Sequence, residues 1–177
     1  MSLPFVERSE VRRVRDMLAP VEPGGSARQV YGAMLEHQIA PTLREWGLDG
    51  DGERFDYPSR VWHLSLAFVP VSWNTVSRFQ FDVNVIAVSR VAWQQWRAHE
   101  PSLPESPDAA VYYAQDFVAG GGLVARLGEL QRDGLDRRWT VHGGVDPAPV
   151  AAEVLTGLKR RVLPQFAGRA EARPLPA

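Results

Sequence analysis

Two neighbouring stretches of the chain carry polar side chains that could do chemistry. His63 and Ser65 alternate with apolar residues in residues 61–69, and Asp82 does so in residues 78–88. A histidine, a serine and an aspartate within reach of one another can act as general base, nucleophile and orienting group. The catalytic candidates are therefore His63, Ser65 and Asp82.

The connection between these stretches, residues 70–77, carries Trp73 and Asn74. Long connections on rigid hairpins are where binding groups tend to lie. An exposed aromatic ring can anchor a protein partner or a ring-bearing ligand. We therefore expect a ligand- or partner-binding surface, whose candidate residues are Trp73, Asn74, His63, Gln80, Asp82 and Asn84.

The same polar residues have a simpler interpretation that stays open. An antiparallel sheet often has one face in water, and that face is polar without any further role. The segments 70–77 and 101–120 discriminate between the interpretations: a site needs them folded over the face that carries His63, and a solvated face does not.

Both stretches are predicted to be strands, because apolar and polar residues alternate with a period of two. Pairing Val69 with Arg78 places both apolar rows on one face of a hairpin. The two rows are Trp62, Leu64, Leu66 and Phe68, and then Phe79, Phe81, Val83, Val85 and Ala87. The polar pairs that this register predicts are His63 with Asn84, Ser65 with Asp82, and Ala67 with Gln80.

A long amphipathic helix is predicted to precede the hairpin. Ser26 is a suitable N-cap, and Gly47 is placed to end the helix. Pro41 lacks the N–H for the bond to the carbonyl four residues back and clashes with that carbonyl. We therefore expect a kink or a restart near Ala40.

A second long helix is predicted after the last strand. Asp146 caps it, and Pro164 is expected to end it. The other predicted elements are helices at 7–18, 89–98 and 108–118, and strands at 53–57, 123–130 and 138–142, with a turn at 48–52. Because the strands are clustered in the sequence, the fold class is α+β: an antiparallel sheet of about five strands with two long helices packed on one face.

The domain organisation follows from these elements. Residues 1–25 are predicted to be an N-terminal helical arm and linker that docks on its own domain, with docking on a neighbouring subunit as the alternative. Residues 26–167 form a single α+β domain, and residues 168–177 a flexible tail.

The composition excludes several classes of function. The chain of 177 residues has no cysteine, which rules out disulfides, thiolate zinc sites and a cysteine nucleophile. Its formal net charge of −1 gives no basic excess for a nucleic-acid backbone. No apolar run reaches the ~18 residues of a membrane span. Lys159 is the only lysine among many arginines, which favours a GC-rich bacterial origin. We expect a soluble, cytoplasmic protein that binds neither nucleic acid nor membrane.

The remaining motifs do not predict a metal or a cofactor. His37 lacks a second histidine four residues later, and His99 and His142 stand alone. The glycines at 120–122 precede a predicted strand rather than a helix, so a phosphate loop is not expected. The predicted metal set and the predicted cofactor are therefore both none.

The order of landmarks resembles a bacterial family known as domain of unknown function 4304. The resemblance covers roughly residues 27–166. It rests on residues 43–48, Phe55, Trp62, residues 78–85, Trp93, residues 125–128, Trp139 and residues 163–164. It implies the α+β fold and, because the family has no established chemistry, no catalytic residues.

Two hypotheses of function result. The first is a small binding protein that recognises a protein partner or a small apolar ligand; one form of it is an immunity-type protein that neutralises a toxin. The alternative is an enzyme that acts on a small molecule in a biosynthetic cluster, with His63 as general base and Asp82 or Ser65 beside it.

Overall fold

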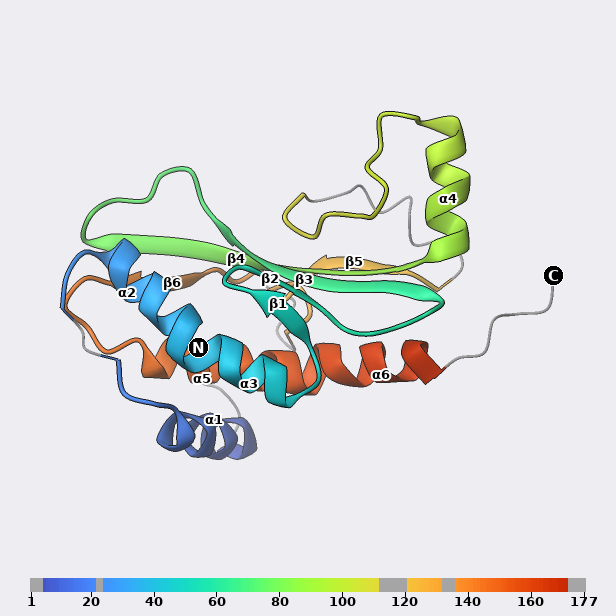
Figure 1. The fold of residues 1–177 in the computed structure, drawn as a ribbon. Coiled ribbons are helices and arrows are strands. Elements are labelled where there is room, and N and C mark those ends of the chain that lie inside the picture. The colour runs from blue at the N-terminus through green and yellow to red at the C-terminus, as the bar shows by residue number, and fades with distance from the viewer. Residues whose placement is uncertain (1–4, 22–23, 112–120, 132–135, 172–177) are drawn as a thin grey trace.

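A six-stranded antiparallel sheet lies at the centre of the computed structural model (Figure 1). The structure describes residues 5–21, 24–111, 121–131 and 136–171. The strands are β1 (Asp49–Asp51), β2 (Arg54–Asp56), β3 (Trp62–Pro70), β4 (Arg78–Ser89), β5 (Leu123–Arg126) and β6 (Trp139–His142). They follow one another across the sheet from β1 to β5, and β6 also pairs with β4. The predicted α+β class is confirmed.

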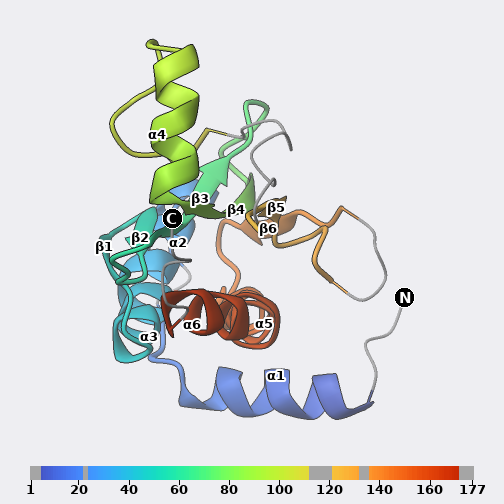
Figure 2. The same cartoon turned by 90° about the vertical axis from the view of Figure 1, so that its right-hand side faces the viewer.

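One face of the sheet is covered by two long helical runs (Figures 1 and 2). The first comprises α2 (Ala27–Met34), the π-helical segment η1 (Leu35–Ile39) and α3 (Ala40–Glu45). The second comprises α5 (Ala148–Gly157), η3 (Leu158–Val162) and α6 (Leu163–Glu171). Ser26 caps the first run through a capping box, and Gly47 follows it with a φ of 87°, both as predicted.

Each long run contains a π-helical turn directly before a proline. The N–H of Ala40 donates to the carbonyl of Leu35, and Pro41 follows; the N–H of Leu163 donates to Leu158, and Pro164 follows. This wider turn shifts the hydrogen-bond ladder, so the helix passes a residue that cannot donate to the carbonyl four back. The π-helical turn lies where a kink or a restart was expected near Ala40, and the helix continues through it. The prediction that Pro164 ends the second helix is wrong, because α6 continues to Glu171. Residues 168–171 of the predicted tail are therefore helical, and its residues 172–177 lie outside the described ranges.

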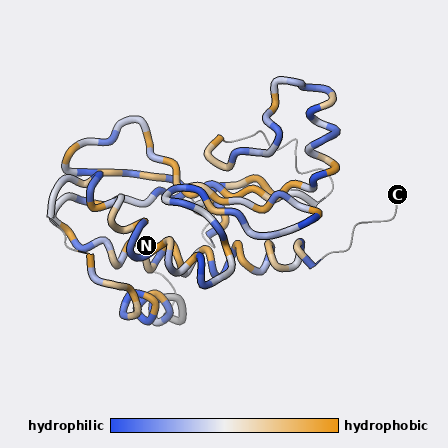
Figure 3. Tube along the Cα trace, viewed as in Figure 1, coloured by the Kyte–Doolittle hydropathy of each residue, from blue (hydrophilic) through white to orange (hydrophobic). Residues whose placement is uncertain are grey.

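The core between sheet and helices is rich in aromatic rings. Tyr31 stacks on Phe79 at 4.4 Å between centroids, and Phe81 lies 6.2 Å from Trp139. Phe68 and Phe81 are at most 1% exposed. Figure 3 shows hydrophobic residues recurring along the strands and the helices beneath them. This is the apolar face that the period-two pattern predicted.

Two further helices lie outside this pair of layers. Helix α1 (Phe5–Met17) packs beneath α5, where Arg160 Nε lies 2.7 Å from Glu10 Oε2 (Figure 2). The arm thus docks on its own chain, as predicted. Helix α4 (Arg90–His99) stands on the opposite face of the sheet (Figure 1). Among the described helices, none combines the length and the hydrophobicity that crossing a bilayer requires.

The predicted hairpin register is wrong by four residues. Val69 pairs with Asp82, not with Arg78, and Phe68 pairs with Val83. Because four is an even number, both apolar rows stay on one face, but every predicted cross-strand polar pair is lost. The predicted turn at 48–52 is also wrong, because residues 49–51 form β1 against β2. Of the predicted helix at 108–118, residues 112–118 lie outside the described ranges, and residues 108–111 form no helix.

The loop after β3 explains this register. Pro70 has no N–H and is the last residue of the β3–β4 ladder. Beyond it, the side chain of Asn74 takes the place of a neighbouring strand: its Oδ1 accepts from Gln80 N at 2.6 Å, and its Nδ2 donates to Gln80 O at 2.9 Å. On its other side, β4 pairs residues 78–81 with β6. The backbone hydrogen bonds of the first residues of β4 are thus made without β3.

Candidate functional site

The face of the sheet opposite the two long helical runs is divided into two polar ends and an apolar centre. His63 pairs with Val88, whereas Asp82 pairs with Val69. Six residues of β3 therefore separate His63 from the partner of Asp82, or about 20 Å at ~3.3 Å per residue. The predicted set of His63, Ser65 and Asp82 is not brought together.

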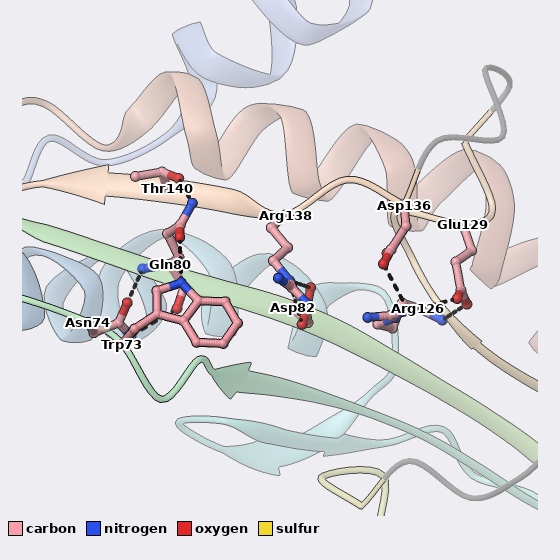
Figure 4. A network of polar contacts seen from close by, with 9 residues as sticks. All are labelled: Trp73, Asn74, Gln80, Asp82, Arg126, Glu129, Asp136, Arg138 and Thr140. Atoms are coloured by element: carbon pink, nitrogen blue, oxygen red, sulfur yellow. Dashed lines mark hydrogen bonds and ion pairs between the residues drawn. The ribbon is translucent and has the colours of Figure 1, made fainter.

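The first end is organised around Trp73 (Figure 4). We call it the Trp73 surface; it consists of Trp73, Asn74, Gln80, Asp82, Arg138 and Thr140. The indole Nε1 of Trp73 donates to Gln80 Oε1 at 3.2 Å, and Gln80 Nε2 donates to Thr140 Oγ1 at 3.1 Å. The guanidinium of Arg138 lies 5.3 Å from the centroid of the Trp73 ring. An aromatic ring on a loop is thus held from two sides.

Asp82 fixes the arginine that supports this ring. Arg138 Nε donates to both carboxylate oxygens of Asp82, at 3.2 and 3.3 Å, and the Asp82 side chain is only 13% exposed. Burial raises the pKa of the Asp82 carboxyl above its usual value, although the charge of Arg138 opposes that change. On the neighbouring strand β5, Arg126 pairs with Asn84 and binds Glu129 at 3.0 Å and Asp136 at 2.8 Å, which continues the charged row (Figure 4).

Three exposed apolar side chains belong to the loops at the same end. Trp73 is 54% exposed, Val76 79% and Val145 53%. The two loops that carry them are joined, because Gly143 N donates to Ser77 O at 3.1 Å. No sequence pattern pointed to Val145, since its neighbourhood depends on the β4–β6 pairing.

Asn84, predicted to bind a ligand, has a structural role. It is 5% exposed, and its Nδ2 donates to the carbonyl of Ala109 at 2.9 Å. Ala109 packs with Trp93, Ala67 and other residues in a small second core on this face. Asn84 thus fastens the segment after α4 to the sheet.

The second polar end is a cleft of about 910 Å³ around His63. We call it the His63 cleft. Its lining includes His63, Ser65 and Trp62 from β3, Asp56 from β2, residues 57–61, Arg90 from α4, and residues 106–107 and 170–171. The hydroxyl of Ser65 donates to Asp56. This hydroxyl is therefore oriented toward a carboxylate rather than toward the imidazole that would activate it.

His63 is neutral at physiological pH in this cleft. Burial lowers the pKa of its imidazole to about 4; the charge of Arg90 lowers the pKa further, and Asp56 acts in the opposite direction. Asp56 was missed as a candidate. Its signal was present in the sequence, because the predicted strand 53–57 turns Phe55 and Tyr57 to one face and Asp56 to the other.

The segments 70–77 and 101–120, which were expected to show whether the His63 face carries a site, lie over different parts of the sheet. The loop 71–77 lies at the Trp73 end and leaves the His63 cleft uncovered. Of the segment 101–120, the described part folds over the centre of the face, where Trp93 Nε1 donates to Pro104 O at 3.1 Å, and residues 106–107 reach the cleft. The prediction of a wholly solvated face is therefore wrong in the centre.

A smaller cavity of about 390 Å³ lies between α2, η1 and the β1–β2 turn. Tyr31 forms part of its lining, and its hydroxyl donates to Glu53 Oε1 at 3.2 Å. Burial raises the pKa of the Tyr31 phenol far above its usual value, and Glu53 adds to this. Sequence reasoning missed this cavity because Tyr31 belongs to the apolar stripe of its helix. Across the described ranges, no three His, Cys, Asp or Glu side chains are grouped to hold a metal ion.

Comparison of the chain with protein-family models, with curated proteins and with solved structures finds no significant match. The resemblance to domain of unknown function 4304 therefore stays a prediction.

Proposed function

We propose that this chain is a binding protein that recognises a protein partner through the Trp73 surface. The observation that carries the proposal is a tryptophan that is 54% exposed and yet held by a hydrogen bond from its indole and by Arg138 against its ring. Tryptophan dominates binding energy at many interfaces. A ring that is already fixed loses little conformational entropy when a partner covers it.

The surroundings of the ring indicate the chemistry of the partner. Val76 and Val145 extend the apolar contact area, while Arg78 and His142 pair across β4 and β6 at the same end. Arg78 makes no ion pair with any described residue. A complementary partner presents an apolar pocket bordered by acidic side chains. An immunity protein that neutralises a toxin is one specific form of this proposal.

Two alternatives receive less support from the geometry. A small apolar ligand is normally enclosed by its site, whereas Trp73 is 54% exposed. An enzyme that uses His63 with Asp82 needs both groups at one substrate, and the register separates them by about 20 Å along the strands. The enzyme hypothesis would have to rest on another pair of groups.

Quantitative affinity capture tests the proposal. The tagged full-length chain and its Trp73→Ala variant are incubated with lysate of the source cells, and retained proteins are compared by mass spectrometry. Loss of a hot-spot tryptophan costs about 2 kcal/mol or more, or roughly 30-fold in Kd. At least one retained protein should therefore be lost with Trp73→Ala.

The matched control uses two exposed valines. Val76→Glu introduces a charge at the Trp73 end, and Val91→Glu introduces the same charge on α4, where Val91 is 62% exposed. Val76→Glu should abolish retention of the same protein and Val91→Glu should preserve it. A retained set that is identical for the wild type, Trp73→Ala and Val76→Glu would rule out the proposal.

A further inference from the structure

We infer that the His63 cleft binds a small molecule through an anionic group, a carboxylate or a phosphate. This second site is independent of protein recognition at the Trp73 surface, because it lies at the other end of β3. The inference rests on the size of the cleft, on the charges that line it and on the way its polar groups are already engaged.

Two arginines line the cleft without a carboxylate partner. Arg90 is held across the turn before β3: its backbone N donates to Val61 O at 2.9 Å, and its Nη2 donates to Ser59 O at 3.2 Å. Arg60 belongs to the same turn. Neither guanidinium makes an ion pair with a described residue, and Arg60 makes no hydrogen bond in that part of the chain. An anion that contacts both guanidinium groups gains charge-assisted hydrogen bonds from each of them.

The acidic groups of the cleft do not replace such an anion. Asp56 accepts the hydroxyl hydrogen of Ser65 at the floor. Glu171 lines the cleft from the end of α6 and makes no ion pair with a described residue. Elsewhere in the described ranges, Arg138 binds Asp82 directly and Arg126 binds Glu129. The arginines at this end are left available for a ligand.

The imidazole of His63 can report whether an anion occupies the cleft. Its ring lines the same cleft, and the charge of Arg90 acts on it directly. The charged groups that act on His63 are Arg90 and Asp56, and Arg60 and Glu171 also line the cleft. A bound anion stabilises the imidazolium form, so it raises the pKa of His63 from about 4 toward neutrality. Trp62 also lines the cleft, from the opposite face of β3, where Arg169 lies 5.6 Å from the centroid of its ring.

The test is a titration of the ¹⁵N-labelled full-length chain with inorganic phosphate, and separately with acetate, at constant ionic strength. The ring resonances of His63 are assigned with His63→Asn. The expected result is a saturable shift of these resonances with at least one of the two anions, together with a rise in the pKa of His63. Which anion saturates distinguishes a phosphate ligand from a carboxylate ligand.

Three variants locate the effect. Arg60→Gln removes a charge without removing any hydrogen bond that the structure shows, and Arg90→Gln keeps a donor near Ser59 O. Each should weaken binding by about tenfold. Arg13→Gln, on the exposed side of α1 beneath the helix layer, should leave the affinity unchanged. Shifts that rise linearly with both anions, or equal weakening by Arg13→Gln, overturn the inference. These outcomes leave capture through Trp73 untouched, so the two proposals fail separately.

Discussion

The two ends of the same sheet face differ in how their polar groups are satisfied. At the Trp73 surface, Arg138 is paired with Asp82 and lies against an indole ring, so charge and ring are fixed together. At the His63 cleft, Arg60 and Arg90 have no carboxylate partner among the described residues, and His63 is held neutral. These differences support the two proposals, that the first end buries an aromatic side chain against a protein partner and that the second binds an anionic group.

This difference teaches that the register, more than the residue types, decides what a polar face can do. The predicted pairing would have gathered His63, Ser65 and Asp82 into one set. A four-residue offset keeps the same face and the same residues, but distributes them over two ends with separate surroundings.

The largest expected effect comes from removing the core beneath the Trp73 surface. Phe81 lies between Gln80 and Asp82 in β4, is 0% exposed and contacts Phe68 and Trp139. Phe81→Ala should lower the free energy of unfolding by about 3–5 kcal/mol, measured by urea denaturation. Val91→Ala, on the surface of α4, should change it by less than about 0.5 kcal/mol. A decrease of less than about 1 kcal/mol in the free energy of unfolding for Phe81→Ala would mean that no well-packed core lies beneath the Trp73 surface.

The next test concerns the other end and follows His63 by NMR as the pH is lowered. The ring should titrate with a midpoint near pH 4, well below its ordinary value of 6.5. As the pH falls, the imidazole is protonated in the unfolded chain near pH 6.5, before it is protonated in the folded chain. Above pH 6.5, His63 therefore does not change the free energy of unfolding, and between pH 6.5 and 4 it lowers that free energy progressively. His63→Asn should remove that part of the acid sensitivity. A midpoint near 6.5 would show that His63 is open to solvent, and the described difference between the two ends of the sheet face would not hold.

The smallest expected effect is that of Asp82→Asn on stability. Burial raises the pKa of this carboxyl, so the folded state disfavours its ionised form despite Arg138. The contribution of Asp82 is therefore most favourable at low pH and is lost as the pH rises through the raised pKa. A neutral amide should change the free energy of unfolding by less than about 1 kcal/mol at pH 7. Its effect should appear instead as greater mobility of Trp73, seen as a lower ¹⁵N order parameter of the indole N–H. A decrease of more than about 2 kcal/mol in the free energy of unfolding would show that the Asp82–Arg138 ion pair stabilises the Trp73 end.

Local patterns predicted most of the fold. The alternation in residues 61–69 and 78–88 gave both strands and their buried faces, and Ser26 gave the start of the first long helix, because each depends on neighbours in the sequence. The passage of the second helix through Pro164 was not predictable by the same rule. Phe166, just beyond the proline, is fully buried 6.0 Å from Tyr57, and this tertiary contact favours continuing the helix.

The candidate site was predicted only in part. The shared face of the polar residues was predicted correctly, since face depends on parity alone. The register depended on the Asn74 side chain and on pairing with β6, about 60 residues later, and neither is a local property. Arg138, which fixes Trp73, was missed for the same reason.

The affinity of the captured partner for three chains tests the central claim, that the two ends act separately and that the Trp73 end carries protein recognition. The chains are the wild type, Trp73→Ala and Arg90→Gln. We expect Trp73→Ala to raise the Kd by roughly 30-fold and Arg90→Gln to leave it unchanged. A Kd that rises only with Arg90→Gln, or equally with both variants, would contradict the account.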